Sequence, residues 1–284
     1  MTSFFNWIGK KSLDFIEEFG EVMILLARIF KFSPKLIKSR KLLLYQMEHI
    51  GVNSLPLVII IASFTGAVAA WQAAYQLQGL APLSFLGAAT SRAIITELGP
   101  VLTAIVIAGR VGASIAAELG SMNVTEQIDA LKTMGISPIR YLAMPRFFAA
   151  LIMMPILVVI ANSIAVFGAY IISDYFLGIS ANVFFDSVRR FFLISDFFFG
   201  IIKGTLFGSV TALIGCHIGF KTEGGAEGVG NSTIRSFVLT SALILISGVM
   251  YLLQILKTAV RATKSSLKPT IGTKSGNKSN GIIR

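Results

Sequence analysis

The chain has 284 residues, of which 54% are hydrophobic and only 14% are charged, and its mean hydropathy is +0.76. This is too little charge to cover the surface of a soluble domain, so the composition excludes one and predicts a polytopic membrane protein. Cys216 is the only cysteine, which excludes an internal disulfide and a cysteine-ligated metal site.

The net charge of +11 is concentrated at the two ends of the chain. Residues 1–48 carry eight Lys or Arg against five acids, and residues 257–284 carry seven Lys or Arg and no acid. Both segments flank hydrophobic stretches, so attraction to anionic lipid headgroups explains the excess better than binding to nucleic acid. We therefore expect no nucleic-acid partner.

Residues 1–30 have the pattern of an amphipathic helix. The charged residues from Lys10 to Lys31 fall within less than half of a helical wheel, and apolar side chains fill the other side. We expect this helix to lie in the membrane interface, although a soluble helix packed on a partner would show the same pattern. Ser33-Pro34 ends it, and a basic linker follows up to residue 48.

Five apolar runs predict five membrane spans within a domain of residues 49–256. The first is expected at 52–77. The next helical stretch, 83–118, would measure about 54 Å, against about 30 Å for the hydrocarbon core. We therefore expect Gly99-Pro100 to break it into a partly inserted or tilted piece and a span at 100–118. The remaining spans are predicted at 147–173, 197–220 and 237–256.

Lys and Arg in short loops predict the orientation. They favour a cytoplasmic location for the N-terminal region and for the connections at 119–146 and 221–235. Five spans then place the basic tail, 257–284, outside, against the positive-inside rule, so the side of this tail stays open. Its Ser, Lys, Gly and Thr content is typical of disorder.

Small residues recur every four positions in two of the predicted spans. Such ladders let helices approach closely in lipid, either inside one bundle or across a dimer interface. The second span carries Ala104, Ala108, Gly112, Ala116 and Gly120, and the fourth carries Gly200, Gly204, Gly208 and Ala212.

Four ionisable residues lie inside apolar stretches, where charge is costly and marks paired or functional sites. Glu97 precedes the Gly-Pro pair and either lines a cavity or forms a structural salt bridge. Arg110 and Glu118 are eight residues apart and share a helix face, which favours a structural network. Lys203 lies near the end of its span and is expected to snorkel towards the interface.

Residues 121–138 predict a short helix between the second and third spans. Asn123 is expected to cap it, with Glu126 three residues later, and Gly135 is expected to end it. Val124, Ile128 and Leu131 make one apolar stripe. A helix at 123–134 could dock into a groove of a soluble partner or rest on the bilayer surface.

No enzyme motif occurs in the sequence. A G-x-x-x-x-G-K-[ST] phosphate loop, H-E-x-x-H and G-x-S-x-G are all absent, so this chain is neither a P-loop ATPase nor a recognisable hydrolase. Cys216 and His217 lack companion ligands, and no metal or cofactor is expected on this chain.

An ordered series of motifs then resembles the MlaE/YrbE permease family, the membrane subunits of ABC lipid transporters that work with MCE-domain proteins. The resemblance covers about residues 48–256, and the basic tail extends beyond the usual end. The motifs are Glu97-Leu98-Gly99-Pro100, Ala108-Gly109-Arg110-Val111-Gly112-Ala113-Ser114, Ala117-Glu118-Leu119-Gly120, Thr125-Glu126-Gln127-Ile128-Asp129-Ala130-Leu131 and Met144-Pro145-Arg146-Phe147.

The resemblance implies a homodimer bound to two copies of a cytoplasmic ABC ATPase, which would hold the ATP and Mg, and to a ring of MCE-domain subunits on the far side. It also implies that the helix at 123–134 is the coupling helix between permease and ATPase. The implied ATPase contacts are Glu126, Gln127, Asp129, Ala130 and Leu131.

The same resemblance implies a phospholipid cavity at the dimer interface. Glu97, followed by Leu98, matches a carboxylate near the lipid site of relatives, whereas Thr96 stands where some relatives carry Arg. Apolar wall positions are expected on the first span, at Leu57, Ile61, Val68 and Tyr75. The host membrane is expected to be a bacterial inner membrane, with a plastid inner envelope as the alternative.

Two other classes of function remain as alternatives. A membrane scaffold could recruit a soluble partner without transport. An ion channel is disfavoured because no span carries a run of polar residues suited to a pore.

Overall fold

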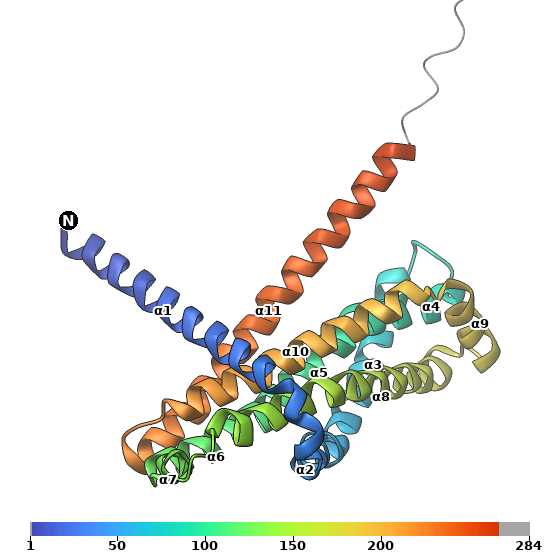
Figure 1. Cartoon of the computed structure of the whole chain (residues 1–284). Coiled ribbons are helices and arrows are strands. Elements are labelled where there is room, and N and C mark those ends of the chain that lie inside the picture. Colours follow the sequence, from blue (N-terminus) through green and yellow to red (C-terminus); the bar gives the residue numbers. More distant parts are fainter. Residues whose placement is uncertain (1, 267–284) are drawn as a thin grey trace, which may run out of the picture. The chain divides into compact units, whose positions relative to one another are not determined.

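The computed structural model describes residues 2–266, and every regular element in that range is helical (Figure 1). The chain divides into two units, Met1–Leu245 and Ile246–Arg284, and the sites below all lie in the first. The helices are α1 (Thr2–Phe32), α2 (Arg40–Ile50), α3 (Leu55–Leu77), α4 (Leu86–Ala93), α5 (Gly99–Ile107), α6 (Ala113–Val124), α7 (Gln127–Thr133), α8 (Met144–Leu177), α9 (Ala181–Phe191), α10 (Ile194–Phe220) and α11 (Gly225–Ser266).

Five helical stretches of the described chain are long and apolar enough to cross a membrane, which confirms the predicted all-α fold with five spans. The second of them joins α4, α5 and α6, and the third includes α8. They are Arg40–Leu77, Leu83–Val124, Ile139–Leu177, Ile194–Phe220 and Gly225–Val249.

The expected break at Gly99-Pro100 is wrong, because the backbone stays helical through it. Pro100 has no N–H to donate to the Thr96 carbonyl four residues earlier. The chain accommodates this with a π-helical turn, Ile94–Leu98, directly before Gly99. A second π turn, Ala108–Gly112, separates α5 from α6.

The predicted small-residue ladder of the fourth span packs inside the chain. A Cβ atom added at Gly204 or Gly208 of α10 would lie within 3 Å of Val158 or Met154 of α8. One added at Gly219 would lie 2.6 Å from Leu119 of α6. Such close approach gives van der Waals contact where lipid removes the hydrophobic drive for helices to associate.

Three helical segments differ from the sequence expectations. Part of the basic linker forms α2. The unpredicted α9 buries Phe184 and Ser187, and the Ser187 hydroxyl oxygen accepts a hydrogen bond from the Ala88 N–H of α4 at 3.2 Å. Disorder from residue 257 is wrong as far as Ser266, where α11 ends. The remainder of the tail, 267–284, lies outside the described residues.

Candidate functional site

The short helix α7 lies at the end of the bundle where α6 ends (Figure 1). The predicted cap at Asn123 is wrong. Asn123 still belongs to α6, and its side-chain amide donates to the Thr222 carbonyl at 3.0 Å. The chain turns instead at Glu126, whose φ of 59° is left-handed, and α7 begins at Gln127. The short helix therefore starts four residues later than expected.

The end of α7 is formed as predicted, by Gly135 with a φ of 74°. The Ile136 N–H donates to the Leu131 carbonyl at 2.9 Å, and the Gly135 N–H donates to the Lys132 carbonyl at 3.0 Å. These two bonds satisfy carbonyls that a helix end leaves without partners. Defined turns thus bound α7 on both sides.

The two faces of α7 differ in burial. Ile128 is buried and Leu131 packs against the same core, so this side holds α7 to the bundle. The remaining candidate ATPase contacts are exposed, and Asp129 accepts a hydrogen bond from Lys132 at 2.8 Å. The exposed candidates are Glu126, Gln127, Asp129 and Ala130.

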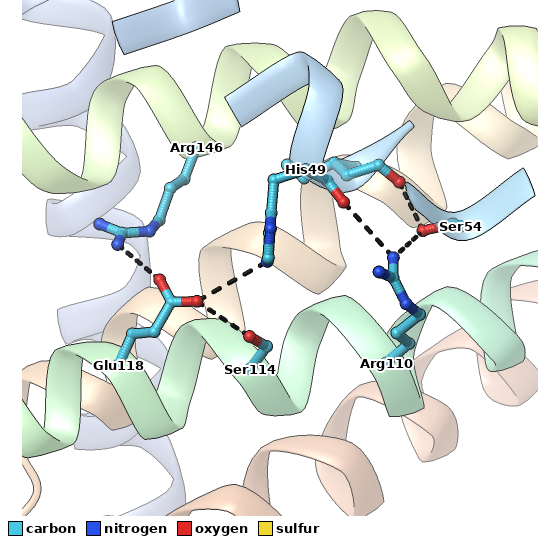
Figure 2. A network of polar contacts seen from close by, with 7 residues as sticks. His49, Ser54, Arg110, Ser114, Glu118 and Arg146 are labelled. Atoms are coloured by element: carbon cyan, nitrogen blue, oxygen red, sulfur yellow. Dashed lines mark hydrogen bonds and ion pairs between the residues drawn. The ribbon is translucent and has the colours of Figure 1, made fainter. Parts of the chain in front are cut away.

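A polar network surrounds Glu118 of α6, the helix that precedes α7 (Figure 2). One carboxylate oxygen of Glu118 accepts a hydrogen bond from the Arg146 guanidinium of α8 at 2.9 Å. The other accepts from the Ser114 hydroxyl at 2.9 Å and lies 3.7 Å from Nε2 of His49. The Arg146 side chain is only 7% exposed, so this carboxylate compensates a charge that water cannot reach.

Arg110 belongs to the same network and lies one helical turn before Ser114, on the side of α5 (Figure 2). Its guanidinium donates to the Ser54 hydroxyl at 2.5 Å and to the His49 carbonyl at 3.4 Å. Ser54 in turn donates to the Ile50 carbonyl at 2.6 Å. Arg110 and Glu118 therefore share a helix face, and both contact His49 at the end of α2, whereas Glu118 also binds Arg146 of α8 and Ser114 of its own helix.

Sequence reasoning missed the partners of these two charges. His49, Ser54 and Arg146 come from other elements, so periodicity on one helix could not find them. Only Arg146 carried a signal, because it lies in the Met144-Pro145-Arg146-Phe147 motif.

The Ser54→Ala substitution is expected to destabilise the protein by about 2 kcal/mol, because Arg110 loses a short charge-assisted hydrogen bond at a buried hydroxyl. Ser63→Ala is the matched control, since within the described part of the chain the Ser63 hydroxyl bonds only to carbonyls of its own helix. Thermal unfolding in detergent measures the difference. Equal effects of both substitutions would show that the Arg110 contact contributes nothing.

A second charged pair joins Glu97 to Lys203. The snorkelling expected of Lys203 is wrong, because its side chain is 1% exposed and its ammonium lies 2.5 Å from a carboxylate oxygen of Glu97. The same ammonium donates to the Thr96 carbonyl at 3.0 Å. Lys203 thus donates a hydrogen bond to a carbonyl inside the π turn, the one to which Pro100 has no N–H to donate.

The candidate lipid-wall residues do not gather at one place within the chain. Leu57, Val68 and Tyr75 lie on the exposed side of α3, opposite the side that packs on α8. Ile61 and Leu98 line a small apolar hollow between α3, α5 and α8. Glu97, one residue before Leu98, is engaged with Lys203 and is 31% exposed.

These features define a polytopic helical membrane protein with a short, partly exposed helix between its second and third spans. The sequence profile of the family described as Permease MlaE matches residues 43–254. The chain is 37% identical over 249 residues to a Rickettsia felis protein named "Probable ABC transporter permease protein", a match that covers 85% of this chain and 93% of the relative.

Two further relatives come from photosynthetic organisms. A Synechocystis protein, also named a probable ABC transporter permease, is 40% identical over 209 residues, covering 74% of this chain and 80% of the relative. The Arabidopsis thaliana chloroplastic protein TRIGALACTOSYLDIACYLGLYCEROL 1 is 36% identical over 204 residues, covering 72% and 58%. The chain belongs to the MlaE permease family, and it is an integral membrane permease subunit of the ABC type.

Proposed function

We propose that this permease moves phospholipid, or a similar lipid, between a membrane and an MCE-domain partner, and that a separate cytoplasmic ATPase binding ATP and Mg drives it. The permease would act as a homodimer in a bacterial inner membrane. Membership of the MlaE permease family supports a transport role. A lipid cargo is supported by the name of the Arabidopsis relative, which includes the name of a glycolipid, trigalactosyldiacylglycerol. A plastid inner envelope remains the alternative membrane.

The proposal rests on the difference between the two faces of α7. One face packs against the core of the bundle, and the other, called the free face below, is exposed. Ile128 and Leu131 attach α7 to the core, so a displacement of α7 is transmitted to the spans. Glu126, Gln127, Asp129 and Ala130 are left for a groove in the ATPase. Closure of two ATPases would therefore move α7 and narrow a lipid cavity between the permeases.

The lipid path would lie between two copies of the chain. Leu57, Val68 and Tyr75 form an exposed stripe on α3 that suits acyl chains, because it carries no charge. Ile61 and Leu98 line a separate small hollow beside α5 that would add to the apolar wall. Glu97 directly precedes Leu98, and its pairing with Lys203 would present a dipolar group rather than a lone negative charge to a lipid headgroup.

The double substitution Glu126→Lys and Asp129→Lys is expected to reduce co-purification of the ATPase about tenfold or more, because it reverses charge on the free face of α7. The matched control is Asp174→Lys with Asp186→Lys, which makes the same charge change at exposed positions outside α7. Pull-down from detergent extracts of the cells that make the protein measures the bound ATPase.

Undiminished ATPase binding by the α7 variant would contradict the coupling role of this helix. Lipid transfer by the reconstituted complex then separates transport from a scaffold. A transporter moves labelled phospholipid only with ATP, whereas a scaffold binds the same partners and moves none.

A further inference from the structure

A hollow of about 310 Å³ lies between α1, the π turn that begins at Ile139 and the last turns of α10. Its apolar lining comes from Ile24, Leu25 and Phe220, and its cations are Arg28 and Lys221. This volume is at the lower end of ordinary ligand pockets. The hollow is separate from the α3 surface discussed above, and no step of the proposed transport uses it.

The hollow borders the ends of two of the stretches that are long and apolar enough to cross a membrane. One membrane-crossing stretch ends at Phe220, and another begins at Ile139. Both residues line the hollow. It therefore lies at the ends of two spanning stretches, on the side where α7 leads into the Ile139 turn, and the proposal below sets it at the level of the lipid headgroups.

Two cations line the hollow, and one of them has no charged partner among the described residues. Lys221 donates to the Glu21 carboxylate, and this hydrogen bond lowers the pKa of Glu21 below its usual value. The Arg28 guanidinium is exposed and has no hydrogen bond or ion pair with any side chain that the structure describes. The negative charge of Glu21 and the positive charge of Lys221 neutralise each other, so the charge of Arg28 makes the hollow positive overall.

A buried imidazole whose Nε2 lacks a hydrogen-bond partner in the described part of the chain borders the same hollow. The side chain of His217 is 6% exposed, and its Nε2 has no hydrogen-bond partner among the described residues. A Glu21 carboxylate oxygen lies 3.8 Å from it, too far for a hydrogen bond. A buried polar nitrogen without a partner is costly, and His217 lines the same hollow.

We propose that this hollow binds the headgroup phosphate of an anionic phospholipid in the leaflet on the α7 side. The Arg28 guanidinium would bind the phosphate in a bidentate manner, which an arginine does better than a lysine. Ile24, Leu25 and Phe220 would contact the glycerol and the upper acyl chains. Because one wall is α1 and the others are α10 and the Ile139 turn, the bound lipid joins the amphipathic helix to the spans.

The test uses the full-length protein in nanodiscs of equimolar phosphatidylglycerol and phosphatidylcholine, followed by detergent extraction and native mass spectrometry of the retained lipid. The wild-type protein is expected to retain phosphatidylglycerol several-fold over phosphatidylcholine. Arg28→Gln should abolish that preference, and Arg28→Lys should keep part of it. Arg40→Gln is the matched control, since it removes the same charge from an exposed position on α2 outside the hollow.

A second measurement, the unfolding temperature, shows whether a variant is misfolded and whether a free anion can replace the lipid. Phosphatidylglycerol should raise the unfolding temperature of the wild type and of Arg40→Gln but not that of Arg28→Gln. Inorganic phosphate added to phosphatidylcholine nanodiscs should not reproduce the increase. The proposal is overturned if Arg28→Gln keeps the lipid preference, if Arg40→Gln loses it equally, or if inorganic phosphate stabilises as well as the lipid.

Discussion

The Glu97→Gln variant is expected to lose about 3 kcal/mol of stability relative to the wild type, because it removes the carboxylate from a lysine ammonium that is almost completely buried. Glutamine keeps the size of the side chain, so the loss reports the charge rather than the packing. Lys203→Met is expected to cost less, since the carboxylate left behind is 31% exposed and can reach polar surroundings.

The double variant Glu97→Gln with Lys203→Met completes the cycle. It should recover part of the loss caused by Glu97→Gln, because no ammonium that has lost its carboxylate is then buried. Some loss should persist, since the Thr96 carbonyl no longer receives the ammonium hydrogen bond. Equilibrium unfolding in mixed detergent measures all three variants. Simple additivity of the two single effects would contradict a coupled pair.

Gly66→Val is expected to destabilise the protein by about 3 kcal/mol or more, because α3 and α8 touch backbone to backbone at this position. A Cβ atom at Gly66 would lie 1.8 Å from the Ala165 carbonyl oxygen. On the facing helix, a Cβ atom at Gly168 would lie 2.5 Å from the Ser63 carbonyl oxygen. Backbone cannot move aside as a flexible side chain can, so the two helices must separate.

Gly20→Ala provides the control for Gly66→Val. Gly20 is also helical, but no described residue lies within 4 Å of a Cβ added there. Alanine is the better helix former, so this substitution is expected to be neutral or to stabilise by up to about 1 kcal/mol. Unfolding temperature in detergent and yield of monodisperse protein measure both variants. A Gly66→Val protein as stable as the control would contradict tight α3–α8 packing.

Local features of the sequence predicted the spans and one end of α7 well. Hydropathy is summed over about 20 neighbouring residues, so it locates a span without knowledge of what the span touches. Gly135 was identified as a helix stop because a left-handed backbone favours glycine whatever surrounds it. The ladder of Gly204 and Gly208 predicted close packing, although only the structure shows that α8 is the partner.

The errors share a different origin. Asn123 has the chemistry of a helix cap, but its amide is used by the Thr222 carbonyl, which is 99 residues away in the chain. Gly99-Pro100 has the chemistry of a helix break, but a π turn and the Lys203 ammonium accommodate it. In both cases a contact distant in sequence overrides a local preference.

The sequence alone determined that this chain crosses a membrane five times, where its small-residue faces lie and which family it resembles, because these depend on composition and short-range pattern. Only the tertiary structure decided which charges neutralise one another. Glu97 with Lys203, Glu118 with Arg146, and Glu21 with Lys221 join segments that are far apart in the chain. The free energy of transferring a span into lipid is a sum of contributions from single residues, so the sequence is enough to estimate it. The compensation of a buried charge depends instead on where one particular partner lies in space.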